Sequence, residues 1–448
     1  MTPTPTSLAA QDRAAEAGAL PRPQPIGALP LPAGYLLIPA DPELDTVRAE
    51  LVAGRLPASW PAALEPLQLA LAGETDAALA AVSGDAPIAR INRFVLDGGP
   101  DAWADLADLE GELGAHVQLV AYSLGLTDDV PSDAGLDGEF AAMALTAQAA
   151  AATETGDLHA AVRASEAAVA AARPVSGALT AQLLGGLAEA RVNAGAAPAT
   201  VVTLFDEAVR LLQHTDLTVG RAELFLAKGL TLHAAGDGNP GALLGAVEAY
   251  QAALGLISAD SAPELFAMCH ANLASAYLTL PMTQASDQLR VGVAVQSLRH
   301  TLSVFTPESH PEQWASAQLN LANALVYMPS AKQGDNLVEA VELYEAVLAT
   351  RDADTDPLGY ARVAANQGNA LAHLGIFGQA KGRLHEARFL FEEHGDLASV
   401  ATVRSVLDEI AKETSAASRN TTTNHALPPR PGTNPDGSPA TRYPTEER

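Results

Sequence analysis

Aromatic side chains are scarce in this sequence. They make up 4% of its 448 residues, although 48% of the chain is hydrophobic. Much of the hydrophobic fraction is alanine, which favours helix and lets helices approach closely. Runs of Val, Ile, Thr and Tyr with the alternation of a β-strand are also hard to find. Together these shortages predict an all-α protein.

Cysteine is almost absent as well. The single Cys269 stands in an apolar stretch, so an intrachain disulfide framework is excluded. The N-terminus lacks the charged start and unbroken apolar core of a signal peptide, and we expect a cytoplasmic protein. The uncharged run 265–286 is long enough to span a bilayer, but it contains His270, Asn272 and Pro281. We therefore expect no membrane insertion.

Positive charge is missing from a long stretch near the N-terminus. The formal net charge is −27, and residues 41–140 contain 19 Asp and Glu but only 4 Arg and no Lys. Between Arg93 and Arg163 there is no Lys or Arg at all. Because proteins bind nucleic acid mainly by neutralising its phosphates, we expect no nucleic-acid partner. The charge instead favours a partner protein with a basic surface.

Four carboxylates in this stretch recur at helical spacing. They are Asp101, Asp105, Asp108 and Glu112. On one helix they would share a face, which predicts an acidic surface that attracts a basic partner or, less specifically, divalent cations. The alternative is a solvated face without a binding role, as is usual for a run of charges.

Motifs for catalysis, nucleotides and metals are absent too. The sequence has no GxxxxGK[ST], GxGxxG or GxSxG motif. Its 11 histidines are scattered, and no second Cys/His pair accompanies Cys269 and His270 at metal-ligand spacing. We therefore predict a non-catalytic protein without a cofactor or a structural metal.

Three prolines mark the starts of three similar segments. PELFAMCHANLASAY begins at Pro263, PEQWASAQLNLANAL at Pro311 and PLGYARVAANQGNAL at Pro357, so the starts lie 48 and 46 residues apart. Proline is well tolerated in the first turn of a helix. Each segment then has an aromatic residue three positions on and a small residue near its middle. This recurrence predicts an array of helical repeats.

A second helix is expected in each copy, because apolar or small residues continue at three- and four-residue spacing. The predicted second helices start at Gly156, Thr200, Gly241, Asn336 and Phe377. We predict about six helical hairpins over residues 140–396. Residues 397–413 are predicted to form a helix that covers the exposed end of the array.

These residues resemble the tetratricopeptide repeat (TPR) family. Its signature is a small residue on the first helix, then a small, a large or aromatic and another small residue on the second helix. Three sets fit it, the second with one substitution: Gly229, Ala246, Tyr250 and Ala253; Ala322, Ala340, Tyr344 and Val347; Gly368, Ala380, Leu384 and Ala387. The resemblance covers somewhat over half the chain and implies a right-handed α-solenoid.

The two ends and the N-terminal region differ from the repeats. Residues 1–40 are rich in proline, and we expect a flexible lead in which the segment YLLIP could pack on the first helices. Residues 41–139 are predicted to be an acidic α-helical region, either continuous with the array or docked on it. Residues 414–448 have almost no apolar content and are predicted to be a disordered tail.

Amide side chains recur on two of the predicted first helices. Asn320 and Asn323 in one repeat match Asn366 and Asn369 in the next. The resemblance implies that first helices line a concave groove, into which Asn323 and Asn369 would project. An amide both donates and accepts, which suits pairing with the backbone of an extended peptide. The alternative is that Asn320 and Asn366 bridge adjacent hairpins.

Arg362 and His373 are expected to face the same groove. Some TPR modules hold a C-terminal carboxylate with lysines and arginines beside such asparagines, but Leu319 and Ala365 occupy the lysine places here. The resemblance therefore does not extend to that clamp. The predicted partner-binding residues are Asn323, Arg362, Asn369, His373, Asn320 and Asn366.

Taken with the missing motifs, the repeats predict a scaffold or adaptor that binds a partner protein or peptide in a groove. The alternative is an accessory factor that helps to mature or assemble a bacterial enzyme complex. A general resemblance to TPR proteins that accompany redox complexes such as nickel–iron hydrogenases suggests this alternative. No motif decides between the two functions.

Overall fold

The structure is a computed structural model that describes residues 22–281, 288–328, 330 and 332–424. The expectations for residues 1–21 and 425–448 lie outside this range. The described residues contain helices and loops but no β-strand, and their one isolated bridge joins Gln24 to Ile38. The chain divides into two compact units, Met1–Trp314 and Ala315–Arg448.

Short helices open the first unit. They are η1 (Ala33–Tyr35), η2 (Pro42–Leu44), α2 (Asp45–Val52), η3 (Ala62–Leu64), α3 (Glu65–Leu71), α4 (Thr75–Ala81), α5 (Pro87–Asp97), α6 (Pro100–Ala104) and α7 (Gly111–Ser123). Their apolar faces share one core that contains Leu51, Ile91 and Phe94. The N-terminal region is therefore helical, as its sequence predicted.

Residues 22–40 pack into this core, and they include the segment YLLIP, which packs on the first helices as the sequence suggested; the rest of residues 22–40 is also held in place and is not a flexible lead. Ile26, Leu36 and Ile38 are at most 1% exposed. Gln24 and Ile38 exchange backbone hydrogen bonds of 3.2 and 3.0 Å. Proline restricts the chain by fixing φ, and burial of the apolar side chains between the prolines stabilises the packed segment. We call residues 22–38 the strap.

The N-terminal helices dock on the repeats through hydrogen bonds as well as apolar contacts. The Ser176 hydroxyl donates to the Val52 carbonyl at 2.8 Å. The Asp216 amide donates to the Gly54 carbonyl at 2.9 Å, and the Asp216 carboxylate accepts from the Leu56 amide at 2.7 Å. Of the two arrangements that the sequence left open, the structure has the docked one.

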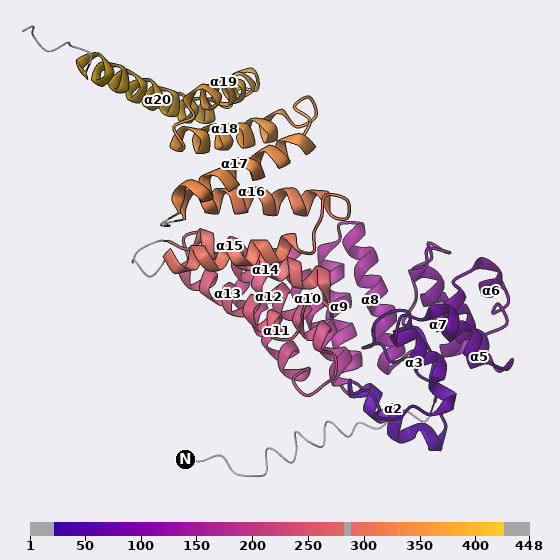
Figure 1. Cartoon of the computed structure of the whole chain (residues 1–448). Coiled ribbons are helices and arrows are strands. Elements are labelled where there is room, and N and C mark those ends of the chain that lie inside the picture. Colours follow the sequence, from indigo (N-terminus) through magenta and orange to yellow (C-terminus); the bar gives the residue numbers. More distant parts are fainter. Residues whose placement is uncertain (1–21, 282–287, 329, 331, 425–448) are drawn as a thin grey trace, which may run out of the picture. The chain divides into compact units, whose positions relative to one another are not determined.

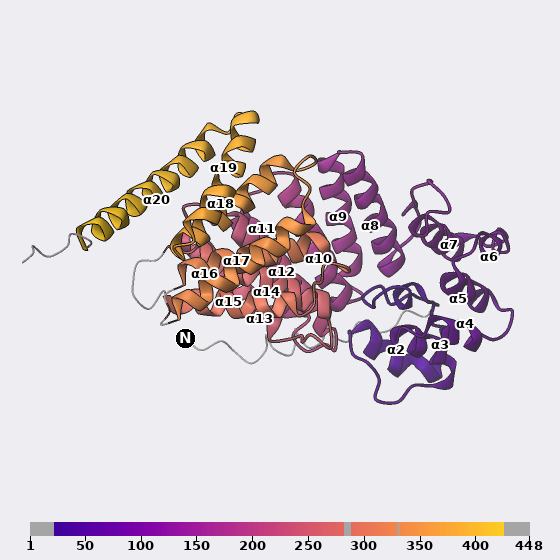
Figure 2. The ribbon, with the colours of Figure 1, turned by 45° about the horizontal axis from the view of Figure 1, so that its top comes forward.

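Four helix pairs follow in the first unit. They are α8 (Gly138–Glu154) with α9 (Leu158–Ala172), α10 (Gly177–Asn193) with α11 (Pro198–Leu211), α12 (Thr218–Ala234) with α13 (Pro240–Leu254), and α14 (Pro263–Thr279) with α15 (Gln288–Leu302). Figures 1 and 2 both show α8 and α9 side by side, between α10 and the short N-terminal helices. No helix among the described residues is long and apolar enough to cross a membrane.

The second unit continues the same pattern. Its helices are α16 (Pro311–Tyr327), which begins just before the boundary, α17 (Gln333–Thr350), α18 (Pro357–His373), α19 (Phe377–Glu393) and α20 (Leu397–Asn424). Pro263, Pro311 and Pro357 each occupy the first residue of a helix, as predicted. The last helix, α20, packs on α19. It extends beyond the predicted end at residue 413, so the prediction of a disordered tail is wrong for residues 414–424, which are helical.

The helices of a pair approach most closely at the small residues of the signature. A Cβ atom on Gly229 would lie 2.4 Å from Cε1 of Tyr250, and one on Gly368 would lie 2.7 Å from Cγ of Leu384. Tyr250 and Leu384 are themselves at most 1% exposed. Because only glycine leaves room for these large side chains, the packing confirms a TPR-like array of helical pairs.

Candidate functional site

A cleft of about 930 Å³ lies on the first unit. Its floor is formed by α8, α10 and α12, the first helices of three successive pairs, and its walls by the strap and the end of α7. The polar lining includes Gln182 and Glu189 of α10 and Glu223 of α12. We call this the inner cleft.

Glycine in the middle of α10 shapes the floor of the inner cleft. Gly185 lies against α12, because a Cβ atom there would come within 2.5 Å of Leu224 Cδ2. Gly186 also lines the cleft, and a Cβ atom on it would meet nothing within 4 Å. Mid-helix glycine costs about 1 kcal/mol relative to alanine. Close packing against Leu224 explains the glycine at 185, whereas no contact within the protein requires the glycine at 186.

The strap lies against one end of the cleft, where residues 26–29 form a turn closed by a hydrogen bond from the Leu29 amide to the Ile26 carbonyl at 2.9 Å. Nε2 of Gln182 donates a 2.7 Å hydrogen bond to the carbonyl oxygen of Ala28 in this turn. The absence of a side chain on Gly27 allows a close approach to Met143 and Leu179, whose atoms would lie 3.2 and 3.4 Å from a Cβ atom there. The first helices therefore already bind one backbone carbonyl outside the repeats, which belongs to the chain itself.

Ion pairs and a buried imidazole hold the strap in place. The Arg22 guanidinium pairs with Glu112 and with Asp137. The Tyr35 carbonyl lies 2.8 Å from Nε2 of His116, which is buried between the strap and α7. Burial lowers the pKa of His116 to about 4, so at neutral pH the imidazole is uncharged and Nε2 can donate to that carbonyl.

A buried carboxyl group lies under the strap. Glu139, in the first turn of α8, is 1% exposed, and neither of its oxygens has a hydrogen-bond partner of normal geometry among the described residues. Burial raises its pKa to about 8, and the Gly27 amide offsets only part of that rise. At neutral pH the group is therefore mainly a neutral acid, as expected for a carboxyl group without a paired cation.

Acidic residues dominate the electrostatics of the inner cleft. Its lining includes Asp128, Glu154, Glu189 and Glu223 but no Lys, Arg or His. Desolvation raises the pKa of Glu189 and of Glu223. Both side chains are still accessible to water; the shift arises because the concave surface puts protein around much of each carboxylate.

The amides that the sequence singled out lie on α16 and α18 of the second unit. Oδ1 of Asn323 accepts hydrogen bonds from the Tyr344 hydroxyl at 2.7 Å and from Nδ2 of Asn366 at 3.1 Å. Asn366 therefore bridges adjacent hairpins, which was the alternative to peptide binding. Gln367 is 2% exposed and donates to the Glu345 carboxylate at 2.7 Å, so it also joins helices.

The other predicted groove residues have fewer contacts. Asn320 and Asn369 are half-buried and make no side-chain hydrogen bond within the described residues. Arg362 and His373 are exposed on α18. The pKa of Asp396, just before α20, is lowered mainly by hydrogen bonds from Ser399 and, to a smaller extent, by the positive charge of Arg362. Partner binding by the predicted set stays a prediction.

The four acidic residues expected on one helical face lie on separate segments. Asp101 is on α6, Asp105 ends that helix, Asp108 lies in the following turn and Glu112 is in the first turn of α7. Helix α6 ends at Ala104 and α7 begins only at Gly111, so the four residues do not share a helical face. Asp108 also pairs with Arg90 at 2.7 Å, so part of this acidity is neutralised within the protein.

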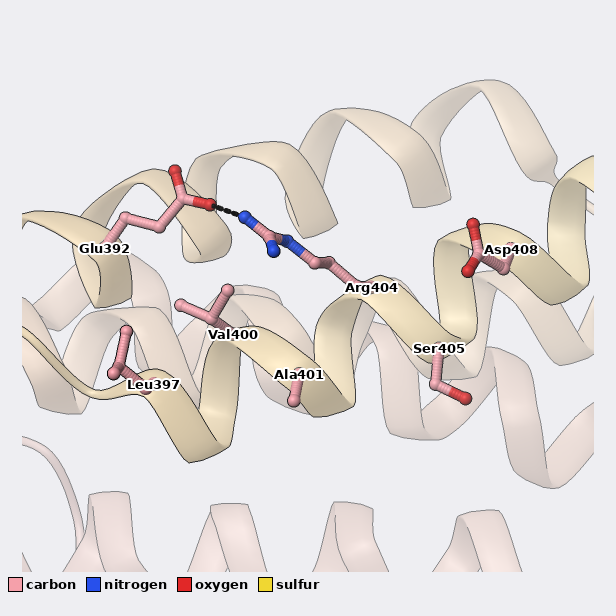
Figure 3. Close-up of a pocket in the computed structure, with 7 residues that line it drawn as sticks. All are labelled: Glu392, Leu397, Val400, Ala401, Arg404, Ser405 and Asp408. Carbon is pink, nitrogen blue, oxygen red and sulfur yellow. Dashed lines mark hydrogen bonds and ion pairs between the residues drawn. The ribbon is translucent and has the colours of Figure 1, made fainter.

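A hollow of about 630 Å³ on the second unit lies between the end of α19 and the first half of α20 (Figure 3). Its one ion pair joins Arg404 Nη2 to Glu392 at 2.7 Å, as Figure 3 shows. Leu397 at its edge is 74% exposed. Since Arg404, the one cation of its lining, already pairs with Glu392 across the two helices, this hollow offers less to a ligand than the inner cleft.

Sequence reasoning missed the inner cleft. Gln182 and Glu223 are each the sixth residue of their helix, α10 and α12, so they occupy the same position in successive repeats. The adjacent glycines at 185 and 186 were a second signal. Within the described residues, no cluster of three or more His, Cys, Asp or Glu is placed to hold a metal ion.

Comparisons with known proteins identify similar helical folds. No model of a protein family matches the chain, and no curated protein sequence matches it significantly. Among solved structures, the TPR2AB domain of yeast Sti1 in complex with pHSP90 is 17% identical, covers 60% of this chain and 98% of its own, and has a TM-score of 0.23. A Rap protein complexed with Competence and Sporulation Factor is 15% identical, with coverages of 79% and 97% and a TM-score of 0.39. The TPR domain of P58(IPK) is 15% identical, with coverages of 77% and 96% and a TM-score of 0.23.

Proposed function

We propose that this protein is a non-catalytic scaffold that holds an extended segment of a partner protein in the inner cleft. The observation that carries the proposal is the hydrogen bond from Gln182 to the Ala28 carbonyl. A side-chain amide that donates to a backbone carbonyl recognises a chain through its backbone, without regard to its side chains. The cleft continues past the strap along α10 and α12, where an extended segment of a partner would find room.

The floor of the cleft suits a backbone at close range. Gly186 of α10 and Gly220 of α12 both line it, and a Cβ atom on Gly186 would meet nothing within 4 Å. The amide of Gln182 and the carboxylates of Glu189 and Glu223 give this lining both donors and acceptors for the polar groups of a bound segment.

Filling the cleft tests the proposal. In the Gly186→Phe variant the new side chain enters open space, so we expect the fold to persist and the cleft to be blocked. Gly382→Phe is the matched control, since it adds the same side chain to an open helical position of α19. The wild type, the variant and the control are each used as bait in the native host, and bound proteins are identified by mass spectrometry.

We expect at least one protein to bind the wild type and the control but not the Gly186→Phe variant. Circular dichroism confirms that both variants are folded. An identical set of bound proteins for all three baits would refute the use of this cleft.

A further inference from the structure

Charge in the inner cleft is one-sided and unpaired. Asp128, Glu154, Glu189 and Glu223 contribute four carboxylates, and none of them forms an ion pair within the described part of the chain. Elsewhere in this unit, acids commonly do pair, as Glu207 does with Arg173 at 2.6 Å. The cleft is therefore a place where the protein concentrates negative charge without supplying a cation.

Two of these carboxylates are held in surroundings that penalise their charge. The pKa values of Glu189 and Glu223 are raised by desolvation, and no other cause contributes. Neither residue has a nearby positive charge that lowers its pKa, as Arg173 does for Glu207. A cation from a ligand would offset that penalty, and partly desolvated ion pairs of this kind can contribute to binding.

The strap indicates how a chain would run past these residues. Gln182 of α10 binds the strap carbonyl, and Glu223 occupies the same position of α12, one repeat further along the cleft. An amide at this position donates to a backbone carbonyl. An ionised carboxylate can only accept, so it selects N–H groups or cationic side chains.

We propose that the open part of the inner cleft binds an extended, basic segment of a partner protein, whose Lys or Arg side chains pair with Glu189 and Glu223. The glycine floor at Gly186 gives the backbone of that segment room, and the long cationic side chains reach down to the carboxylates. This inference rests on the proposed scaffold function and names the chemical class of its partner. A neutral extended segment is the competing occupant.

Peptide binding tests the inference directly. The probe is a fluorescein-labelled synthetic peptide of about 12 residues, roughly 40 Å when extended, in which Arg alternates with Gly and Ala. A second peptide carries Gln in place of every Arg. Fluorescence anisotropy with the full-length protein gives the dissociation constants, and we expect the Arg peptide to bind at least about tenfold more tightly than the Gln peptide.

Matched variants then locate the site. The double variant Glu189→Gln and Glu223→Gln should weaken binding of the Arg peptide by about tenfold or more. The control, Glu248→Gln with Glu342→Gln, removes the same charge from exposed positions of α13 and α17 and should leave the dissociation constant within about twofold.

The possible outcomes separate this inference from the proposed function. Equal weakening in the two double variants, or equal affinity of the two peptides, would overturn the basic-partner inference. If the Arg peptide fails to bind while Gly186→Phe still abolishes capture of a host protein, the scaffold function stands and the occupant is not basic. If that capture is also unaffected by Gly186→Phe, both proposals are wrong.

Discussion

Replacing the buried Glu139 by glutamine should change how the stability of the N-terminal region depends on pH. In the folded protein the pKa of Glu139 is raised to about 8, from an ordinary value of 4.5. Folding therefore favours the protonated acid. The contribution of protonated Glu139 to the free energy of unfolding is fully present below pH 4.5 and is lost progressively as the pH rises through 8.

The magnitude follows from the size of the shift. One pKa unit corresponds to about 1.36 kcal/mol, so the full penalty of an ionised Glu139 is at most about 5 kcal/mol. Rearrangement of the strap and the N-terminal end of α8 would reduce that penalty. We expect the free energy of unfolding of Glu139→Gln, measured relative to the wild type, to increase by about 2 to 4 kcal/mol between pH 5 and pH 9.

Urea unfolding monitored by tryptophan fluorescence is the assay. Trp60 and Trp103 pack against the N-terminal core, so their emission reports on this region. Glu248→Gln is the control, because it removes an exposed carboxylate and hence the same charge from the chain. If the curves of unfolding free energy against pH for wild type, Glu139→Gln and Glu248→Gln run parallel, Glu139 is not a buried neutral acid and the reasoning fails.

Three further predictions concern the repeats. Gly229→Ala should destabilise the protein by about 1 to 3 kcal/mol in urea unfolding, because the methyl group would collide with Tyr250; an unchanged midpoint would contradict the packing argument. The pKa of His270 is lowered to about 4, first by burial and then by the neighbouring imidazole of His300. Folding therefore favours the neutral imidazole, whose contribution to the free energy of unfolding is fully present above pH 6.5 and is lost as the pH falls toward 4. His270→Phe should therefore reduce the fall in melting temperature, measured by circular dichroism, between pH 6.5 and pH 4. The same fall in the variant as in the wild type would exclude His270 as its cause. Asn323→Ala should lower the free energy of unfolding by about 1 to 3 kcal/mol, because the Tyr344 hydroxyl and Asn366 Nδ2 lose their acceptor. Asn369→Ala should leave the stability nearly unchanged, and equal losses of stability in the two variants would contradict this difference between the two residues.

The asparagines illustrate how a recurring pattern leaves the role of each residue open. Asn366 donates to Asn323 of the preceding repeat, whereas its counterpart Asn320 makes no side-chain hydrogen bond within the described residues, so recurrence alone does not separate bridging from ligand binding. Only the position of Asn366 Nδ2, 3.1 Å from Asn323 Oδ1, distinguishes the two roles. Spacing along a chain assigns a residue to a face of a helix, but it does not assign the hydrogen-bond partner.

The strap shows the same limit for composition. Prolines in residues 22–40 predicted a flexible lead, yet Ile26 and Ile38 are buried at the first unit's core. The distinction depends on whether a complementary apolar surface exists elsewhere in the chain, and local composition does not contain that information.

Sequence alone determined the helical pairs, because periodicity, helix-starting prolines and small residues act within one or two turns. Pro263, Pro311 and Pro357 open helices, and Gly229 and Gly368 admit large side chains, as local pattern predicted. Only the tertiary structure brought Ala28, Gln182 and Glu223 to one cleft. These residues are separated by as many as 195 positions, and their proximity depends on how the strap packs across α8, α10 and α12. Such long-range packing is set by the summed burial of many side chains rather than by any motif.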